Sequence, residues 1–140
     1  MIRIRGATTA DLRMLLQVEE ESFAQPHWEM QDFLKYDCRV AEVGGEIAGF
    51  LISRQAFSGD GHGPEREILN LAVARRFRRS GVATALLQEE LSRKGTYFLE
   101  VRESNLAAQE LYRKFGFREI GKRPDYYQCP VERAIVMQMK

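Results

Sequence analysis

The sequence predicts a mixed α/β fold in which helices cover both faces of one central, mixed sheet. Some segments alternate apolar and polar residues, as strands do, and others repeat apolar residues at helical spacing. These segments follow one another in the order β-α-α-β-β-β-α-β-α-β-β. The chain has 140 residues, 44% of them hydrophobic, which is enough for one compact core. We therefore expect a single domain over residues 1–140.

The chain opens with a predicted strand and two predicted helices. Isoleucines alternate with arginines over residues 2–5, which is typical of a short strand. Residues 8–11 form a helix-start signal, and the helix that follows should end by about Gln25, because Pro26 cannot continue it. A shorter amphipathic pattern over residues 28–36 predicts a second helix.

A hairpin and a loop are predicted next. Two apolar runs at residues 39–43 and 47–52 are separated by Gly44-Gly45, which is typical of a tight turn between two strands. Residues 57–64, with the sequence FSGDGHGP, show no periodicity and are rich in glycine. They therefore predict a loop.

The second half of the chain predicts alternating strands and helices. Apolar residues recur on one helical face over residues 80–93 and again over residues 105–115. The predicted strands are residues 67–73, 97–101, 117–120 and 134–139.

Composition narrows the classes of function. Lys and Arg total 21 against 20 Asp and Glu, so the net charge of +1 does not favour direct contact with nucleic acid or a membrane surface. The two cysteines and two histidines lie apart from one another, so we expect neither a metal site nor a disulfide framework. No apolar run has the length of a signal peptide or a membrane span, which makes the cytoplasm the expected location.

An arginine-rich turn lies between a predicted strand and a predicted helix. Its sequence is Arg75-Arg76-Phe77-Arg78-Arg79-Ser80-Gly81-Val82-Ala83-Thr84. The start of a helix presents backbone N–H groups without helical partners and the positive end of the helix dipole, so this turn suits a pyrophosphate. It lacks the endings of a Walker loop and of a dinucleotide fingerprint. The alternative is an ordinary helix cap with solvated arginines.

Glu100 is a carboxylate inside a short apolar strand. It shares a face with Phe98, so we expect it to point into covered space. An ionised carboxylate there costs several kcal/mol unless it is paired or its pKa rises. A raised pKa would suit a general base, and the alternative is a structural ion pair with Arg102.

Tyr112 and Asn105 belong to the helix that follows. Tyr112 lies on the apolar face of that helix, where packing in the core is the ordinary role of an aromatic residue. Asn105 stands at the helix start, where an asparagine is a common N-cap, and this role is compatible with ligand binding.

Taken together, these residues resemble the GNAT superfamily of acyl-CoA-dependent N-acetyltransferases. The phosphate-loop pattern stands here as Arg78-Arg79-Ser80-Gly81-Val82-Ala83, preceded by Leu69-Asn70-Leu71-Ala72-Val73 and followed by Asn105 and Tyr112. Within the superfamily the sequence is most similar to the bacterial ribosomal-protein-alanine N-acetyltransferases. Four stretches carry that likeness: residues 25–28, 68–73, 99–105, and 123–127 leading to 132–137.

The resemblance implies a fold, a cofactor and a set of site residues. It implies a mostly antiparallel mixed sheet with a splayed acyl-CoA-binding cleft, and transfer of an acetyl group from acetyl-CoA to the N-terminal alanine of a small-subunit ribosomal protein. Glu100 would be the base and Tyr112 the acid. The residues implied to bind acetyl-CoA are Leu71, Ala72, Val73, Arg78, Arg79, Ser80, Gly81, Val82, Ala83, Thr84 and Asn105.

Two alternative functions are consistent with the same residues. The acceptor could be a small-molecule amine or a lysine, and the domain could bind acyl-CoA without catalysis. The sequence departs from the family pattern in the short link Ser92–Tyr97 and in Arg133, which follows Glu132 where an acidic residue is usual. We expect a monomer or a weak dimer that binds a protein or peptide N-terminus.

Overall fold

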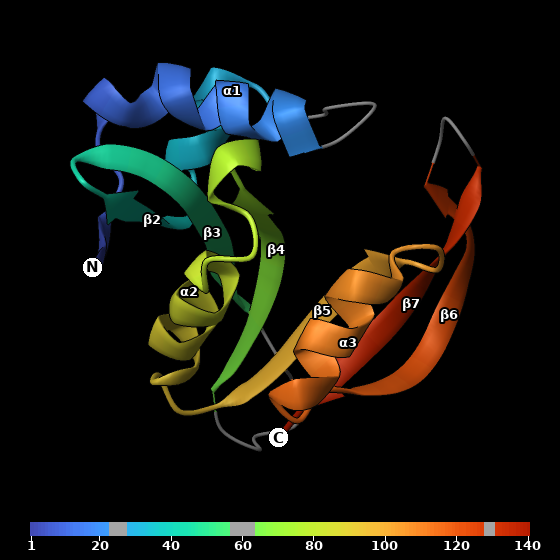
Figure 1. Ribbon diagram of the computed structural model, residues 1–140. Helices are drawn as coiled ribbons and strands as arrows, with labels where there is room; N and C mark the ends of the chain where they lie inside the picture. The colour runs from blue at the N-terminus through green and yellow to red at the C-terminus, as the bar shows by residue number, and fades with distance from the viewer. Residues whose placement is uncertain (23–27, 57–63, 128–130) are drawn as a thin grey trace. The chain divides into compact units, whose positions relative to one another are not determined.

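The computed structural model describes residues 1–22, 28–56, 64–127 and 131–140. Their Cα atoms group into two compact units, one made of Met1–Arg54 with Leu69–Arg93 and the other of Gln55–Ile68 with Lys94–Lys140. Each unit is a mixed α/β arrangement (Figure 1), which confirms the predicted fold class. None of the helices that the structure describes combines the length and apolarity of a membrane span.

The first unit is a four-stranded sheet with helices on both faces. Its strands hydrogen-bond in the order β1-β2-β3-β4, and β1, β2 and β3 are antiparallel. Its elements are β1 (Ile2–Gly6), η1 (Thr9–Asp11), α1 (Leu12–Ser22), η2 (Met30–Leu34), β2 (Asp37–Val43), β3 (Glu46–Ala56), β4 (Glu65–Val73), η3 (Arg75–Phe77) and α2 (Val82–Leu91). Of β4, only the part from Leu69 onwards belongs to this unit.

Helix α1 and the 3-10 turn η2 cover one face of this sheet. Leu15 and Val18 of α1 and Phe33 of η2 are buried in one apolar cluster with residues of β2 and β3. The ring centroids of Phe33 and Phe50 are 5.3 Å apart in an edge-to-face contact, which aromatic pairs prefer. The apolar spacing of residues 28–36 therefore buries one face as predicted, although the segment forms a 3-10 helix rather than an α-helix.

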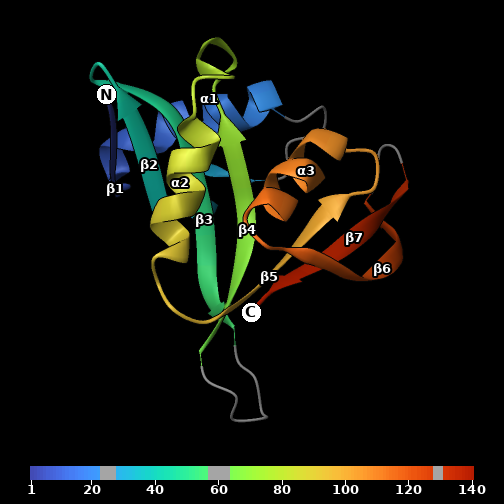
Figure 2. The same cartoon turned by 60° about the horizontal axis from the view of Figure 1, so that its bottom comes forward.

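Helix α2 covers the opposite face (Figure 2). Ser53 of β3 donates to Glu90 of α2 at 2.7 Å, and both side chains are buried. A Cβ on Gly49 would lie 2.7 Å from the carbonyl oxygen of Ala72 and 3.1 Å from Val82 Cγ1. Gly49 is thus required where β3, β4 and α2 meet, because a larger residue would collide with backbone.

The second unit contains the remaining strands and one helix. Its strands hydrogen-bond in the order β4-β5-β7-β6, with β4 and β5 parallel and the others antiparallel. Its elements are the first part of β4, β5 (Thr96–Arg102), α3 (Leu106–Lys114), β6 (Arg118–Tyr127) and β7 (Glu132–Met139). Helix α3 lies beside β5 and β7 in both views (Figures 1 and 2).

Most predicted elements are confirmed, with differences at their ends. Gly44 and Gly45 have φ angles of 59° and 82°, as the predicted hairpin turn between β2 and β3 requires. Strand β6 is the largest difference, because it continues to Tyr127 where the sequence pattern predicts an end near Ile120. The predicted end of the first helix at Gln25 and nearly all of the predicted loop at 57–64 lie outside the described residues.

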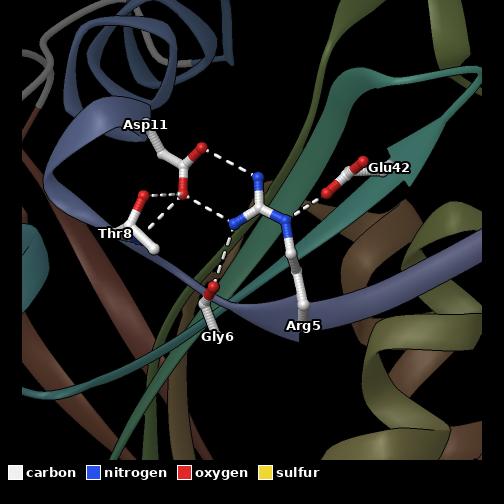
Figure 3. A network of polar contacts seen from close by, with 5 residues as sticks. All are labelled: Arg5, Gly6, Thr8, Asp11 and Glu42. Atoms are coloured by element: carbon white, nitrogen blue, oxygen red, sulfur yellow. Dashed lines mark hydrogen bonds and ion pairs between the residues drawn. The ribbon is translucent and has the colours of Figure 1, made fainter.

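Arg5 joins β1, β2 and η1 through a network of charged groups (Figure 3). Its guanidinium donates to both carboxylate oxygens of Asp11, at 2.8 and 2.9 Å, and also to Glu42. The Thr8 backbone N–H donates to the same Asp11 carboxylate at 2.7 Å. These bonds, led by the one from Arg5, lower the pKa of Asp11 from 3.8 to about 2.

This network predicts a specific loss of stability in acid. Because the folded-state pKa of Asp11 lies below its unfolded value, its contribution is complete above pH 3.8 and is lost as the pH falls towards 2. The shift corresponds to about 2 kcal/mol. We expect Asp11→Asn to be less stable at pH 7 and to lose less stability than the wild type between pH 4 and 2. Urea unfolding across that range measures this, with Glu20→Gln, an exposed carboxylate of α1, as the control; equal acid losses in wild type and Asp11→Asn would contradict it.

Candidate active site

The arginine-rich turn leads directly into α2. Arg79 and Gly81 both have positive φ angles, 63° and 83°, and Gly81 is the N-cap residue of α2. The N-cap supplies no side-chain hydrogen bond to the first turn of the helix, and a Cβ on Gly81 would meet nothing within 4 Å. The helix therefore presents uncapped N–H groups beside open space, which is the arrangement that binds phosphate groups at helix starts.

Arg78 is tied to the backbone instead of extending into solvent. Its Nε donates to the carbonyl of Val73 at 3.3 Å and its Nη2 to the carbonyl of Glu21 at 3.5 Å. The Glu21 side chain in turn accepts from the backbone N–H of Arg75 at 3.4 Å. Arg78 thus fixes the turn to the ends of β4 and α1, a role that the sequence pattern does not reveal.

Strand β4 extends beyond its pairing with β5. The parallel pairing of β4 with β5 runs to Ile68 opposite Leu99. Ala72 is buried, whereas Leu71 and Val73 are half-buried. Leu71–Val73 therefore lie beyond the residues of β4 that pair with β5.

A buried polar pair next to these residues was missed by the sequence analysis. Asn70 of β4 donates to the carboxylate of Glu19 on α1 at 2.6 Å, and Glu19 is 0% exposed. The amphipathic pattern of α1 places Glu19 beside apolar positions, which is the only sequence signal for its burial. The bond fixes α1 to β4 one residue before Leu71.

Glu100 is half-buried on β5 and holds a cation from β6. Its Oε1 accepts from Arg123 Nη1 at 2.7 Å, and its side chain is 17% exposed. Its Oε2 is buried and has no hydrogen-bond partner among the described residues. The sequence predicts that Glu100 lies on the covered face of β5. This prediction is wrong, because Tyr97, Leu99 and Val101 are the buried residues of that strand.

Arg102, the cation that the sequence offered as a partner for Glu100, interacts with β7 and the end of β6. Its Nη1 donates to Glu132 at 3.2 Å, and its guanidinium carbon lies 4.4 Å from the ring centroid of Tyr127. Arg123, which takes the expected place of Arg102 at Glu100, lies 4.2 Å from the ring centroid of Tyr126. Two arginines therefore stack on two adjacent tyrosines.

Tyr112 packs on α3 as its helical spacing predicts. It is 7% exposed, and its ring centroid is 5.6 Å from that of Phe117 in an edge contact. Burial raises the pKa of its hydroxyl well above the usual value of 10, and the charge on Tyr127 adds to the shift. The hydroxyl is protonated at neutral pH, and burial makes it a weaker acid than an exposed tyrosine.

Asn105 begins α3 as the N-cap that the sequence predicts. Its side-chain oxygen accepts from the backbone N–H of Ala108 at 3.2 Å. The turn before it is held by Glu132 of β7, whose carboxylate accepts from the backbone N–H of Ser104 at 2.5 Å. Hydrogen bonds from Ser104, that of its side chain first and that of its backbone N–H second, lower the pKa of Glu132 below its usual value of 4.5. Glu132 thus positions the start of α3, and only its contacts in the structure reveal this.

The first unit thus carries a helix start of the kind that binds phosphate groups, and the second unit carries a half-buried carboxylate and a buried tyrosine hydroxyl. A model of the Acetyltransferase (GNAT) family matches residues 10–117, so the match runs through both units. The chain belongs to this family. It is therefore an N-acetyltransferase that uses acetyl-CoA. The turn fits the phosphate groups of that cofactor, because its helix start is uncapped and the space at Gly81 is open.

The relatives include enzymes that are named for N-terminal acetylation. An N-alpha-acetyltransferase of Sulfolobus acidocaldarius is 34% identical over 89% of this chain and 84% of its own length. The ribosomal protein bS18-alanine N-acetyltransferase of Escherichia coli strain K12 is 32% identical over 99% of this chain and 97% of its own. The crystal structure of the ribosomal-protein-S18-alanine N-acetyltransferase from Escherichia coli has a TM-score of 0.83 at 32% identity, covering 99% of this chain and 93% of that one.

Proposed function

We propose that this enzyme acetylates the N-terminal α-amine of a protein, and that alanine at the start of a small-subunit ribosomal protein is its acceptor. The support comes from the relatives that share nearly the whole length of the chain and carry names for this activity. The site observation that carries the proposal is Glu100, whose Oε1 is held by Arg123 while Oε2 makes no hydrogen bond to any described residue.

The first unit would hold the cofactor. Backbone N–H groups at the start of α2 would bind its pyrophosphate, and the backbone of Leu71–Val73 would bind its acetyl and pantetheine end. Bound acetyl-CoA supplies an acetyl group activated as a thioester. The proposed phosphate-binding residues are Arg79, Ser80, Gly81, Val82, Ala83 and Thr84, with Arg78 holding the turn in place.

Glu100 would act as the general base. An N-terminal amine with a pKa near 8 is about one-tenth neutral at pH 7, so it needs only a modest base to lose its proton. Glu100 is held in one orientation by Arg123, which leaves Oε2 to accept that proton directly or through water.

Tyr112 would act as the general acid. Its hydroxyl is protonated at neutral pH and would donate that proton to the departing thiolate. Burial raises the pKa of the hydroxyl, which makes this transfer more uphill. Asn105, at the start of the same helix, would contact the cofactor near the thiol arm while it caps α3. Tyr112 and Asn105 both belong to the β5–α3 part of the second unit.

A panel of acceptors tests the choice of substrate. The protein is incubated with acetyl-CoA and hexapeptides with free N-termini, a matched set with blocked N-termini and an internal lysine, and a polyamine. We expect a mass increase of one acetyl group on free N-termini that begin with alanine, and much less on the others. Faster acetylation of the lysine peptides or of the polyamine would overturn the proposal.

A further inference from the structure

We propose that the last turn of α1 positions the two halves of the acetyl-CoA site separately: Glu19, through Asn70, positions the backbone for the acetyl end, and Glu21 positions the arginine-rich turn. The inference rests on the placement of the cofactor in the proposed function and adds positioning residues to it. It comes from hydrogen bonds that join this helix turn, directly or through Arg78, to both ends of Leu71–Val73. All of these residues belong to the first unit.

The bond between Glu19 and Asn70 is the buried link. Asn70 Nδ2 donates to Glu19 Oε2 at 2.6 Å, and the two residues are 9% and 0% exposed. A hydrogen bond to a carboxylate is stronger than a neutral one, and removal of the donor leaves a buried charge poorly satisfied. Ala72, two residues after Asn70, packs in the apolar cluster that contains the buried face of α1. The backbone around Leu71 is therefore fixed against the helix at alternate residues of β4.

Glu21 meets the arginine-rich turn. Its Oε1 accepts from the backbone N–H of Arg75 at 3.4 Å, and its carbonyl accepts from Arg78 Nη2 at 3.5 Å. The Nε of the same guanidinium donates to the carbonyl of Val73 at 3.3 Å. Figure 1 shows the end of α1 beside the turn that follows β4. These bonds are longer than the one at Asn70, so we expect smaller effects from their loss.

The charge of Glu21 allows positioning to be distinguished from a direct electrostatic effect. A carboxylate beside a phosphate-binding turn repels the phosphate, so removal of its charge alone would strengthen binding. Loss of a hydrogen bond that holds the turn would weaken binding instead, because the ligand must then order the turn. The two roles therefore predict opposite changes in affinity.

Calorimetric titration of the whole protein with two ligands tests the acetyl half. One ligand is acetyl-CoA, and the other is 3′-phospho-ADP, which carries the pyrophosphate but no pantetheine. Asn70→Ala should raise the Kd of acetyl-CoA about tenfold and leave the Kd of 3′-phospho-ADP within about twofold of the wild type. Glu19→Gln keeps an acceptor oxygen but loses the charge, so it should raise the first Kd about threefold, and it provides the test if Asn70→Ala does not fold.

Ser53→Ala is the matched control for the acetyl half. It removes another buried hydrogen bond to a carboxylate, the one of 2.7 Å from Ser53 to Glu90, which also joins a strand of the first unit to a helix. Both Kd values should stay within about twofold of the wild type. Equal increases for the two ligands in Asn70→Ala, or the same increase for acetyl-CoA in Ser53→Ala, would assign Asn70 to stability alone and overturn the inference.

Glu21→Ala tests the phosphate half, with Glu20→Ala as its control. We expect Glu21→Ala to raise the Kd of both ligands about threefold. Glu20 is the exposed neighbour on the same helix, and its substitution removes the same charge. Glu20→Ala should therefore leave both Kd values equal to those of the wild type or slightly lower. Binding to Glu21→Ala that is as tight as to the wild type, or tighter, would overturn the role of Glu21.

These titrations contain no acceptor, so their outcome is separate from that of the acceptor panel. Expected changes in Kd without acetylation of any peptide N-terminus would overturn the proposed acceptor and uphold the inference. Unchanged Kd values in Asn70→Ala and Glu21→Ala would overturn the inference while acetylation of the alanine peptides upheld the proposed function. Binding of neither ligand by the wild type would overturn the placement of the cofactor and the inference together.

Discussion

Glu100→Gln is expected to lower kcat by about 10²- to 10³-fold while leaving the affinity for acetyl-CoA within about twofold of the wild type. The change keeps the shape of the side chain, and an amide oxygen can still accept from the charged guanidinium of Arg123, so we expect the fold to be kept. The side chain loses its negative charge and its capacity to take a proton. Single-turnover kinetics with an alanine peptide and calorimetric titration with acetyl-CoA measure the two quantities separately.

Glu103→Gln provides a matched control for this result. Glu103 lies three residues further along the chain, also pairs with cations, and undergoes the same loss of charge. We expect its kcat to stay close to that of the wild type. A kcat for Glu100→Gln that equals the wild-type value at saturating peptide would show that Glu100 is not the base.

Tyr112→Phe is expected to lower kcat by about 10²-fold with little change in thermal stability. Phenylalanine keeps the ring that packs edge-on to Phe117, so the core contact survives and only the proton donor is lost. Because burial raises the pKa of Tyr112, the wild-type kcat should show no loss from tyrosine ionisation near pH 10. Steady-state kinetics from pH 7 to 10 and thermal unfolding measure both effects.

Tyr97→Phe removes another buried tyrosine hydroxyl from the same unit and serves as the control. It should leave kcat near the wild-type value. The opposite pattern at Tyr112→Phe, an unchanged kcat with a lower melting temperature, would assign Tyr112 to packing alone.

Local patterns were sufficient to predict the elements whose signals lie within a few residues. The Gly44-Gly45 turn and the start of α3 at Asn105 are examples, since a positive φ angle and an N-cap are properties of single positions. Strand β6 was predicted too short because its pairing with β7 is irregular between Glu119 and Gly121 and again between Arg123 and Tyr127. Such irregularities interrupt the alternation on which strand prediction depends.

The candidate site also contains some features that consecutive residues predict and others that depend on residues far apart in the chain. The turn that ends at Gly81 was recognisable because its residues are consecutive in the chain. The partner of Glu100 was not, since Arg123 is 23 residues away and comes close only through the pairing of β5 and β6 with β7. The bond between Glu19 and Asn70 joins residues 51 positions apart, so no window along the sequence contains both.

The place of β7 in the sheet has a consequence for biosynthesis. Glu100 lies beyond the part of β5 that pairs with β4, and its registered neighbour is Val136 of β7. Glu132, which fixes the turn before Asn105, also belongs to this last strand. A nascent chain can therefore form the sheet of β1, β2 and β3 early. It cannot position Glu100 or the turn before Asn105 until its final residues have been synthesised. Fragments that stop before β7 should consequently have no acetyltransferase activity, whatever part of the first unit they fold.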